Sequence, residues 1–385
     1  MCAFMDFSET RLAARKKLPK AIFDYIDRGT EAETAINGLR AAFDRRRIVQ
    51  RTLRNLQNID LSVEVLGKTR IHPLLIAPTA LAGLVRYNGE IEIARGAAEA
   101  NIPYCASTQA STKIEDIVAG AHNSEIWFQL YPWQDQEATF KLIDRVRDLG
   151  IKTLVVTVDT PGSPKKVHNL RNGFSIPLKP SAKLAFDLMM HPQWTLGVVG
   201  RYWFNQGFPS YDNYPGDARA AITRSVSDPR YAMVKNFEPA AISAIRDHWK
   251  DILVIKGIQH PDDAELAINL GVQGVVVSAH GGRNIDSLAF PLIVLPAIRQ
   301  KIGGKATIFA DSGIQRGSDI AKLMGAGADA VFAGRSFLWA LASAGQAGIP
   351  RMTNILLDEL KTFMAFAGME NINSLQSAKW IDDNF

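Results

Sequence analysis

The chain has 385 residues, of which 47% are hydrophobic and 22% charged, the composition of a globular protein with a substantial core. Its formal net charge of +5 permits an anionic ligand and gives no support for nucleic-acid binding. The two cysteines, Cys2 and Cys105, offer neither a disulfide framework nor the spacing of a metal site. The sequence has no apolar stretch long enough for a membrane span and no secretion signal, so we expect a cytoplasmic protein.

Short apolar runs recur along the chain, and most are followed by an amphipathic segment. Such runs are typical of strands buried on both faces of a parallel sheet. The predicted strands are Pro73–Ala77, Ile102–Ser107, Ile126–Leu130, Thr153–Val158, Ile252–Lys256, Gly274–Ser278, Ala306–Ala310 and Ala330–Ala333. The predicted helices are Gly89–Ala100, Lys113–Ala119, Gln136–Leu149, Pro261–Leu270, Phe290–Ile302 and Gly317–Gly325. This succession predicts an α/β fold, a (β/α)8 TIM barrel, with an open doubly wound sheet as the alternative.

Two segments interrupt this β/α rhythm within what we expect to be a single domain, residues 1–385. Residues 1–70 are predicted to form helices that flank or plug the barrel. Roughly ninety residues separate the fourth and fifth strands, too many for one crossover helix. Within them we predict a loop insertion on the catalytic face, residues 175–235. Its apolar part, from Lys183 to Trp203, favours packing on the barrel or on another subunit, with membrane contact as the alternative.

The stretch from Ser278 to Asn284 follows the sixth predicted strand and contains His280, Arg283 and two glycines. A histidine can accept a proton, and an arginine can bind a carboxylate through paired hydrogen bonds. A Gly-rich turn with a surface arginine is the alternative. The residues at the other strand ends, most of which are polar, favour an enzyme, because these ends converge on one mouth of a TIM barrel. They are Pro78, Thr79, Ala80, Ser107, Thr108, Gln129, Tyr131, Thr157, Asp159, Lys256, Asp311, Ser312, Gly313, Gly334 and Arg335.

The loops after the last two strands predict a phosphate site. Asp311–Gly317 follows the seventh strand, and Gly334-Arg335 follows the eighth. In TIM barrels these two loops, with a helix N-terminus, bind phosphate through backbone N–H groups and an arginine. Lys256, at the end of the fifth strand, is expected to face an anionic or electron-rich ligand, and a structural ion pair is the alternative.

Nearly the whole chain, from Leu18 to Leu338, resembles the FMN-dependent α-hydroxy-acid dehydrogenases and oxidases, a family that includes lactate and mandelate dehydrogenases, lactate oxidase and glycolate oxidase. The motifs that carry the resemblance are Ala77-Pro78-Thr79-Ala80, Gln129-Leu130-Tyr131, Thr157-Val158-Asp159-Thr160-Pro161, Lys256-Gly257-Ile258 and the stretch around His280. The Asp311-Ser312-Gly313 motif and the long insertion are most similar to the bacterial dehydrogenases.

The resemblance implies an FMN cofactor and oxidation of an L-2-hydroxy acid to a 2-oxo acid. It assigns to the flavin Pro78, Thr79, Ala80, Ser107, Gln129, Thr157, Lys256, Ser278, Asp311, Ser312, Gly313, Gln315, Gly334 and Arg335. Tyr25, Lys166 and Arg283 would hold the substrate carboxylate, and Tyr131 its hydroxyl. His280 would accept a proton while a hydride passes to flavin N5, and Asp159 would stabilise the imidazolium.

Four positions depart from the family pattern. The second carboxylate-binding arginine falls on Lys166, its companion acid on Asn169, the asparagine before His280 on Ala279, and the first phosphate-loop arginine on Gln315. Arg335, Arg316 and backbone amides would then hold the phosphate. A lysine offers a point charge where an arginine offers a fork, so we expect a retained flavin site and an altered substrate site. The substrate would be a hydroxy acid bulkier than lactate. A flavoenzyme of the same fold that oxidises a modified amino acid, peptide or natural-product intermediate is one alternative, and a non-enzymatic interaction protein is another.

The resemblance leaves the electron acceptor open between oxygen, a quinone and a carrier protein. Ala80 lies where many oxidases of the family have alanine, whereas the other motifs are dehydrogenase-like. Family members are commonly tetramers or larger, so we expect a homo-oligomer. The expected location is cytoplasmic, with membrane association through residues 175–235 as the alternative.

Overall fold

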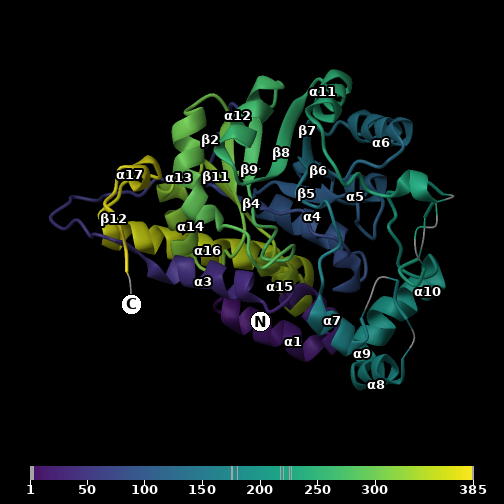
Figure 1. Cartoon of the computed structure of the whole chain (residues 1–385). Coiled ribbons are helices and arrows are strands. Elements are labelled where there is room, and N and C mark those ends of the chain that lie inside the picture. The colour runs from purple at the N-terminus through teal and green to yellow at the C-terminus, as the bar shows by residue number, and fades with distance from the viewer. Residues whose placement is uncertain are drawn as a thin grey trace.

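A computed structural model of the protein describes residues 4–174, 177–179, 181–216, 218, 219, 221–224, 226 and 228–383. Its centre contains β4 (Leu74–Ile76), β5 (Tyr104–Ser107), β6 (Ile126–Leu130), β7 (Thr153–Thr157), β8 (Ile252–Ile258), β9 (Gly274–Val277), β10 (Thr307–Ala310) and β11 (Ala330–Ala333). These parallel strands close into a barrel in the order β10-β11-β4-β5-β6-β7-β8-β9. The barrel lies at the centre of the molecule, with helices around it (Figure 1). The predicted TIM barrel is confirmed. Each strand lies in its predicted run, except that β8 continues to Ile258.

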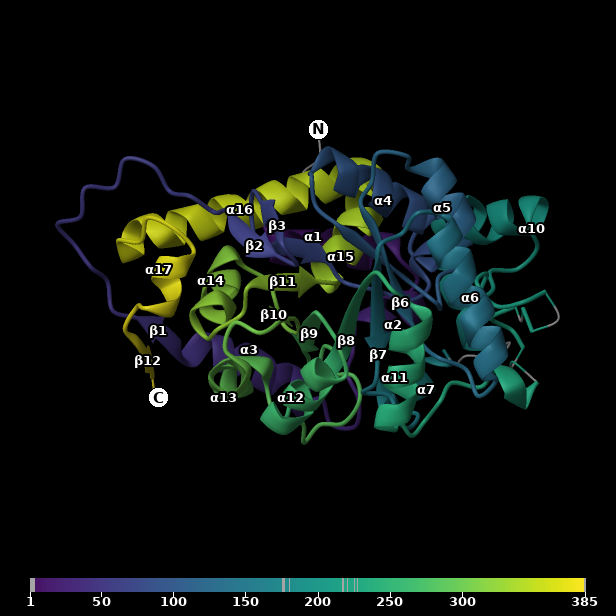
Figure 2. The same cartoon turned by 90° about the horizontal axis from the view of Figure 1, so that it is seen from above.

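Helices cover the outside of the barrel (Figure 2). They are α4 (Gly89–Glu99), α5 (Ile114–Gly120), α6 (Gln136–Asp148), α11 (Pro239–His248), α12 (Pro261–Asn269), α13 (Pro291–Ile302), α14 (Gly317–Gly325) and α15 (Arg335–Ala344). The chain ends with α16 (Gly348–Ala367), α17 (Asn373–Gln376) and β12 (Trp380–Asp382). The sequence prediction omitted α11, α15 and α16. In α15 a run of seven residues from Ser336 to Ala342 is buried, so no polar face marks it as an amphipathic helix.

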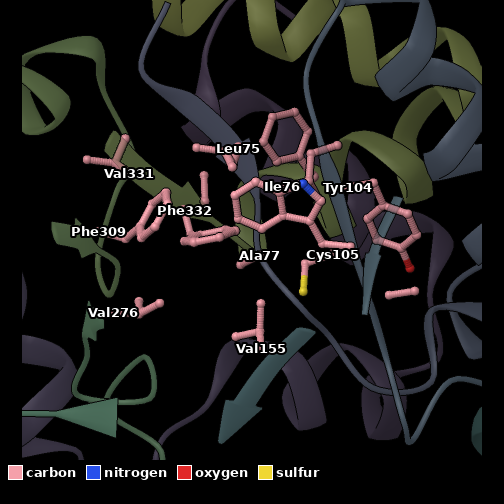
Figure 3. Packing of buried hydrophobic residues seen from close by; sticks show 14 of the residues in the cluster. Leu75, Ile76, Ala77, Tyr104, Cys105, Val155, Val276, Phe309, Val331 and Phe332 are labelled. Carbon is pink, nitrogen blue, oxygen red and sulfur yellow. The ribbon is translucent and has the colours of Figure 1, made fainter. Parts of the chain in front are cut away.

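Aromatic side chains fill the interior of the barrel. The ring centroids of Trp127, Phe309 and Phe332 lie 5.3–5.8 Å apart, and the aliphatic side chains of neighbouring strands surround them (Figure 3). This cluster is fully buried, and tilted and edge-to-face contacts of this kind add to the stabilisation from burial. Because apolar rings fill the interior, a polar ligand can bind only at the mouth of the barrel, at the carboxyl ends of the strands.

The N-terminal segment forms three helices and a hairpin. The helices are α1 (Phe7–Lys17), α2 (Lys20–Asp27) and α3 (Thr34–Arg45). They are followed by β1 (Arg46–Ile48), which pairs with β12, and by the hairpin of β2 (Val63–Val65) and β3 (Lys68–Arg70). The prediction of helices alone therefore omitted three strands. Each has three residues, too few for a periodic pattern, and the hairpin turn places Leu66 and Gly67 at positive φ.

The insertion between β7 and β8 contains helices where a loop was predicted. They are α7 (Val167–Asn172), α8 (Ala182–Met190), α9 (Pro192–Trp194), the π-helical turn η2 (Thr195–Gly200), α10 (Arg201–Asn205) and the 3₁₀ turn η3 (Pro229–Tyr231). The Ser181 hydroxyl caps α8 by accepting from Leu184 N. Apolar residues on the buried and exposed sides obscure the helical period. Cys2 and a few residues of the insertion lie outside the described residues.

Candidate active site

The polar strand ends meet in one cavity of about 300 Å³ at the mouth of the barrel. Eighteen of the twenty site residues predicted from the sequence line it: Tyr25, Pro78, Thr79, Ala80, Ser107, Gln129, Tyr131, Thr157, Lys166, Lys256, His280, Arg283, Asp311, Ser312, Gly313, Gln315, Gly334 and Arg335. The other two, Asp159 and Ser278, lie behind the wall, where they contact His280 and Lys256.

His280 and Asp159 form a close pair. Nδ1 of His280 lies 2.9 Å from Oδ1 and 3.1 Å from Oδ2 of Asp159. Burial raises the pKa of Asp159, but interaction with His280 and the positive charge of Lys256 outweigh burial and bring this pKa below its ordinary value. Asp159 is therefore an anion near neutral pH. A carboxylate at Nδ1 fixes a proton there, which leaves Nε2 of the imidazole as the proton acceptor.

Two serines hold His280 in an uncommon backbone conformation. His280 has a φ of 51°, in the left-handed region that few residues other than glycine adopt. The Ser278 hydroxyl accepts from His280 N at 2.9 Å. The Ser312 hydroxyl accepts from Ala279 N and Gly281 N, at 3.1 and 2.9 Å, and donates to Asp311 Oδ1. The loop is therefore fixed by side chains at the ends of β9 and β10, as strained backbone at a functional site requires.

A row of buried polar groups crosses three adjacent strands on one side of the cavity. The Ser107 hydroxyl donates to Gln129 Oε1 at 2.8 Å, and Gln129 Nε2 donates to the Thr157 hydroxyl at 3.0 Å. Lys256 Nζ lies 3.0 Å from Asp311 Oδ2 and 2.9 Å from the Ser278 hydroxyl. Burial lowers the pKa of Lys256, yet attraction to Asp311 and Asp159 outweighs it and raises this pKa above its ordinary value. The wall thus presents hydrogen-bonding groups and one fixed cation.

The predicted phosphate site, in the loops after β10 and β11, offers mainly backbone N–H groups. Helix α15 begins at Arg335, so its first N–H groups have no intrahelical acceptor, and Gly313 and Gly334 border the same end of the cavity. The expectation that Arg316 helps to hold a phosphate is wrong. Its guanidinium lies 2.8 Å from Asp6 and 3.1 Å from Glu359, outside the cavity. Arg335 donates to Ile26 O and Gly281 O, both at 2.9 Å.

Arg283 and Tyr25 line the cavity close to Arg335, because Arg283 and Arg335 both donate to the Ile26 carbonyl. Nη1 of Arg283 donates to the carbonyls of Tyr25, Ile26 and Arg28, at 2.7–3.1 Å, which fixes the guanidinium. Its carbon Cζ lies 5.2 Å from the Tyr25 ring centroid. Burial raises the pKa of Tyr131, with a further rise from Asp159, so this phenol keeps its proton and can donate a hydrogen bond.

Lys166 is a cation without a counter-ion among the described residues. No carboxylate oxygen of the described chain lies within 4.0 Å of its Nζ, which sits 5.0 Å from the Tyr25 ring centroid. Burial, together with repulsion from Arg283 and Arg335, lowers the pKa of Lys166 to about 7. An anion in the cavity would restore the charged form, so the part of the site around Lys166, Arg283 and Arg335 suits a negatively charged ligand.

Several lining residues were missed from the sequence, among them Gln109, Thr160, Ser163, Met233 and Asn284. Met233 comes from the far end of the insertion, where Val234 N donates to Pro132 O and Met233 pairs with Trp133. Gln109 Nε2 lies 3.4 Å from Met233 Sδ. Only the pairing of distant segments brings Met233 to the cavity, whereas Gln109, Thr160 and Ser163 closely follow the ends of β5 and β7. Asn284 had a local signal, because it ends the His280 stretch; its Nδ2 donates to Asp159 O at 2.6 Å.

Comparisons with known proteins agree with this geometry. Residues 14–382 match the family model described as FMN-dependent dehydrogenase. The chain is 34% identical over 376 residues to an L-lactate dehydrogenase of Pectobacterium atrosepticum, covering 96% of this chain and 95% of that one. It is 34% identical over 379 residues to a putative L-lactate dehydrogenase of Mycobacterium tuberculosis, covering 97% and 88%.

Solved structures show the same relationship. A crystal structure of the monotopic membrane protein (S)-mandelate dehydrogenase superposes with a TM-score of 0.92 at 32% identity, covering 99% of this chain and 100% of the other. A mandelate oxidase variant with (S)-mandelic acid superposes with a TM-score of 0.82 at 28% identity and full coverage of both chains. The chain therefore belongs to the FMN-dependent dehydrogenase family, and it is an oxidoreductase with FMN as its cofactor.

Proposed function

We propose that the protein oxidises an L-2-hydroxy acid to the corresponding 2-oxo acid. The observation that carries this proposal is the convergence of the Asp159–His280 pair, Arg283 and Tyr131 on one cavity. A proton acceptor, a carboxylate-binding cation and a phenol donor are the groups that this reaction requires. The relatives named as lactate and mandelate dehydrogenases support the same substrate class.

The cavity fits FMN through the chemistry of its donors. When bound, FMN supplies an acceptor for the two electrons removed from the substrate. Lys256 and the Ser107–Gln129–Thr157 row would hold the polar edge of the ring system, and Pro78, Thr79 and Ala80 would pack against it. The amides at Gly313, Gly334 and Arg335 would bind the phosphate at the N-terminus of α15. Asp311 and Ser312 would support this site by holding Lys256 and the His280 loop.

The substrate carboxylate would lie between Arg283 and Lys166, beside the Tyr25 ring. Three carbonyls occupy Nη1 of Arg283, so its other N–H groups are directed to the ligand without further ordering. Tyr131 would donate to the substrate hydroxyl, and Nε2 of His280 would accept the hydroxyl proton. Asp159 then balances the charge that appears on the imidazole, which avoids an unpaired cation in a half-buried site.

The insertion carries an apolar surface that we propose contacts a membrane. This surface consists of Phe186, Met189 and Met190 on α8, Leu196 on η2, and Trp203 and Phe204 on α10, whose exposed fractions are 60–86%. Exposed Lys183 and Arg201 flank it and suit anionic lipid headgroups. Among the described residues no helix is long and apolar enough to cross a membrane. The similar (S)-mandelate dehydrogenase is described as monotopic, which supports surface attachment.

Surface attachment favours a membrane quinone as the electron acceptor over oxygen or a soluble carrier protein. The proposal also includes a cytoplasmic location, one catalytic domain spanning residues 1–385 with residues 175–235 as its insertion, and a homo-oligomer of at least four subunits, as the family resemblance implies. Oxygen uptake compared with reduction of a short-chain quinone distinguishes the acceptors.

Replacing His280 with Gln or Ala should slow substrate-driven flavin reduction strongly. In the wild-type holoenzyme, L-lactate, L-mandelate or a longer 2-hydroxy acid should bleach the flavin under anaerobic conditions. Without the proton acceptor the rate should fall by about 10²- to 10⁴-fold, while FMN stays bound. The matched control is His122→Gln, because His122 is exposed and does not line the cavity. Bleaching of H280Q at the wild-type rate would refute the role of His280 as proton acceptor.

The wild-type protein also tests the alternative functions. Bound FMN that no 2-hydroxy acid bleaches would favour oxidation of a modified amino acid, peptide or natural-product intermediate. A colourless protein would favour a non-enzymatic interaction protein.

Anion binding should depend on pH through Lys166. In the free protein Lys166 has a pKa of about 7, so it is mostly neutral above that pH. A bound carboxylate raises this pKa, so above about pH 7 binding is coupled to uptake of a proton by Lys166. Calorimetric titration of the holoenzyme with oxalate should show affinity falling by up to about tenfold per pH unit above pH 7, and no such loss below it. In Lys166→Arg the cation stays charged and this loss should disappear. An equal pH dependence in both proteins would contradict the role of Lys166.

Charged substitutions on the apolar surface should prevent membrane binding. The wild-type protein should float with vesicles of phosphatidylcholine and phosphatidylglycerol, whereas the double variant Met189→Glu/Phe204→Glu should remain at the bottom of the gradient. Leu53→Glu is the matched control, because Leu53 is fully exposed and belongs to the segment between β1 and β2, a different part of the chain from α8 and α10. Wild-type protein that stays with the unbound fraction, or a double variant that floats equally well, would exclude this docking surface.

A further inference from the structure

Helix α2, which carries Tyr25, has no N-terminal cap of its own. It follows Pro19, receives no side-chain cap from its own flank and has no acidic residue in its first turn. The N–H groups of Lys20 and Ala21 donate instead to the two carboxylate oxygens of Asp187, each at 3.0 Å. Asp187 lies on α8, 167 residues from Lys20, and its side chain is only 17% exposed. The insertion thus supplies the acid that the start of α2 lacks.

The other end of α2 is held by the arginines of the cavity. Arg283 donates to the carbonyls of Tyr25, Ile26 and Arg28, and Arg335 donates to that of Ile26. An anion at the N-terminus and cations at the C-terminus match the helix dipole. Both ends of this short helix are therefore fixed by charged groups from distant parts of the chain.

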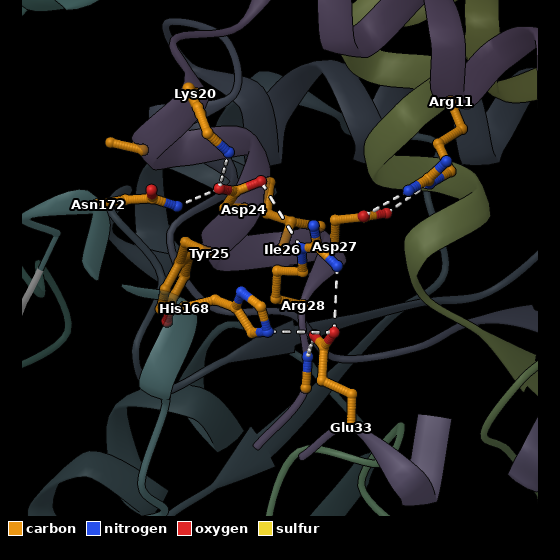
Figure 4. Close-up of polar contacts among 12 residues, drawn as sticks. Arg11, Lys20, Asp24, Tyr25, Ile26, Asp27, Arg28, Glu33, His168 and Asn172 are labelled. Atoms are coloured by element: carbon orange, nitrogen blue, oxygen red, sulfur yellow. Dashed lines mark hydrogen bonds and ion pairs between the residues drawn. The ribbon is translucent and has the colours of Figure 1, made fainter. Parts of the chain in front are cut away.

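Other contacts of α2 involve its side chains and leave its N-terminal amides to Asp187. Arg11 pairs with Asp27, Asn172 and Lys20 contact Asp24, and Arg28 contacts Glu33 (Figure 4). The Tyr25 ring lies 5.0 Å from the ring of Phe174, between these contacts and the cavity. Among these contacts, the carboxylate of Asp187 is the one that binds the amides at the start of α2, the helix that carries Tyr25.

We propose that Asp187 is a positioning residue for substrate binding, acting through α2 on Tyr25. This inference rests on the proposed function, in which Tyr25 contacts the substrate carboxylate. Asp187 lies on the same helix as Phe186, Met189 and Met190, so one carboxylate connects the apolar surface to the substrate cavity.

A double-mutant cycle with Tyr25→Phe tests the inference. Asp187→Ala should raise the Kd for oxalate and the KM for substrate by about three- to tenfold, the range expected for a lost cap, with kcat little changed. Asp187→Asn should restore most of the affinity, because its amide oxygen still accepts from one backbone N–H. In the Tyr25→Phe background, Asp187→Ala should change Kd by less than about twofold, because the two residues act as one unit. Asp148→Ala, at an exposed site on α6, is the control.

Hydrogen exchange of the α2 amides gives a readout that needs no substrate. Residues 20–27 should exchange faster in Asp187→Ala than in the wild type and Asp148→Ala, and Asp187→Asn should regain protection. Equal factors of weakening in the wild-type and Tyr25→Phe backgrounds, or unchanged exchange of α2, would overturn the inference. If the wild type neither binds oxalate nor reduces its flavin, the proposed function fails, and the exchange data still decide whether Asp187 holds α2.

Discussion

The contact between Asp159 and His280 joins two segments that are 121 residues apart, and the chemistry of the cavity depends on it. An anion next to a half-buried imidazole stabilises the positive charge that appears when the ring accepts a proton. Asp159 follows β7 and His280 follows β9, and β8 lies between these two strands in the barrel. Ser278, Ser312 and Asn284 help to hold the pair, and the Ser278 hydroxyl also accepts from Lys256 Nζ. This role explains why several polar residues of the motifs lie beside the cavity or behind its wall.

The remainder of the site is organised around negative charge. Four cations face the cavity, and among the described residues only Lys256 has a carboxylate partner there, Asp311. Arg283 and Arg335 use part of their hydrogen-bonding capacity on backbone carbonyls at the end of α2, which fixes them before any ligand arrives. Lys166 has no carboxylate partner in the part of the chain that the structure describes, and its pKa of about 7 leaves it partly neutral near that pH. When the site is empty, loss of the proton from Lys166 reduces its repulsion with Arg283 and Arg335. A bound anion favours the return of that proton, and with it the positive charge.

The fold and most of the cavity could be predicted from the sequence, because in a parallel barrel the residues that follow each strand all lie at the same end of the barrel. Once the eight apolar runs were placed, residues such as Gln129, Thr157 and His280 had to meet at one mouth. Residues whose position depends on pairing between distant segments could not be predicted. Met233 reaches the cavity through contact with Trp133, and Arg316 is turned outward by Asp6 and Glu359. Residues 182–205 were not predicted as helical, because an apolar outer surface removes the polar face on which periodicity depends.

The most direct test of this account is the rate of anaerobic flavin reduction in Asp159→Asn, measured by stopped flow at saturating substrate. An asparagine keeps the size of the side chain and removes the charge that stabilises the protonated imidazole. The account predicts that FMN binding is retained and that the rate falls by about 10²-fold or more. Reduction at the wild-type rate would show that the charge of Asp159 has no part in the reaction, and the proposed role of the pair would have to be abandoned.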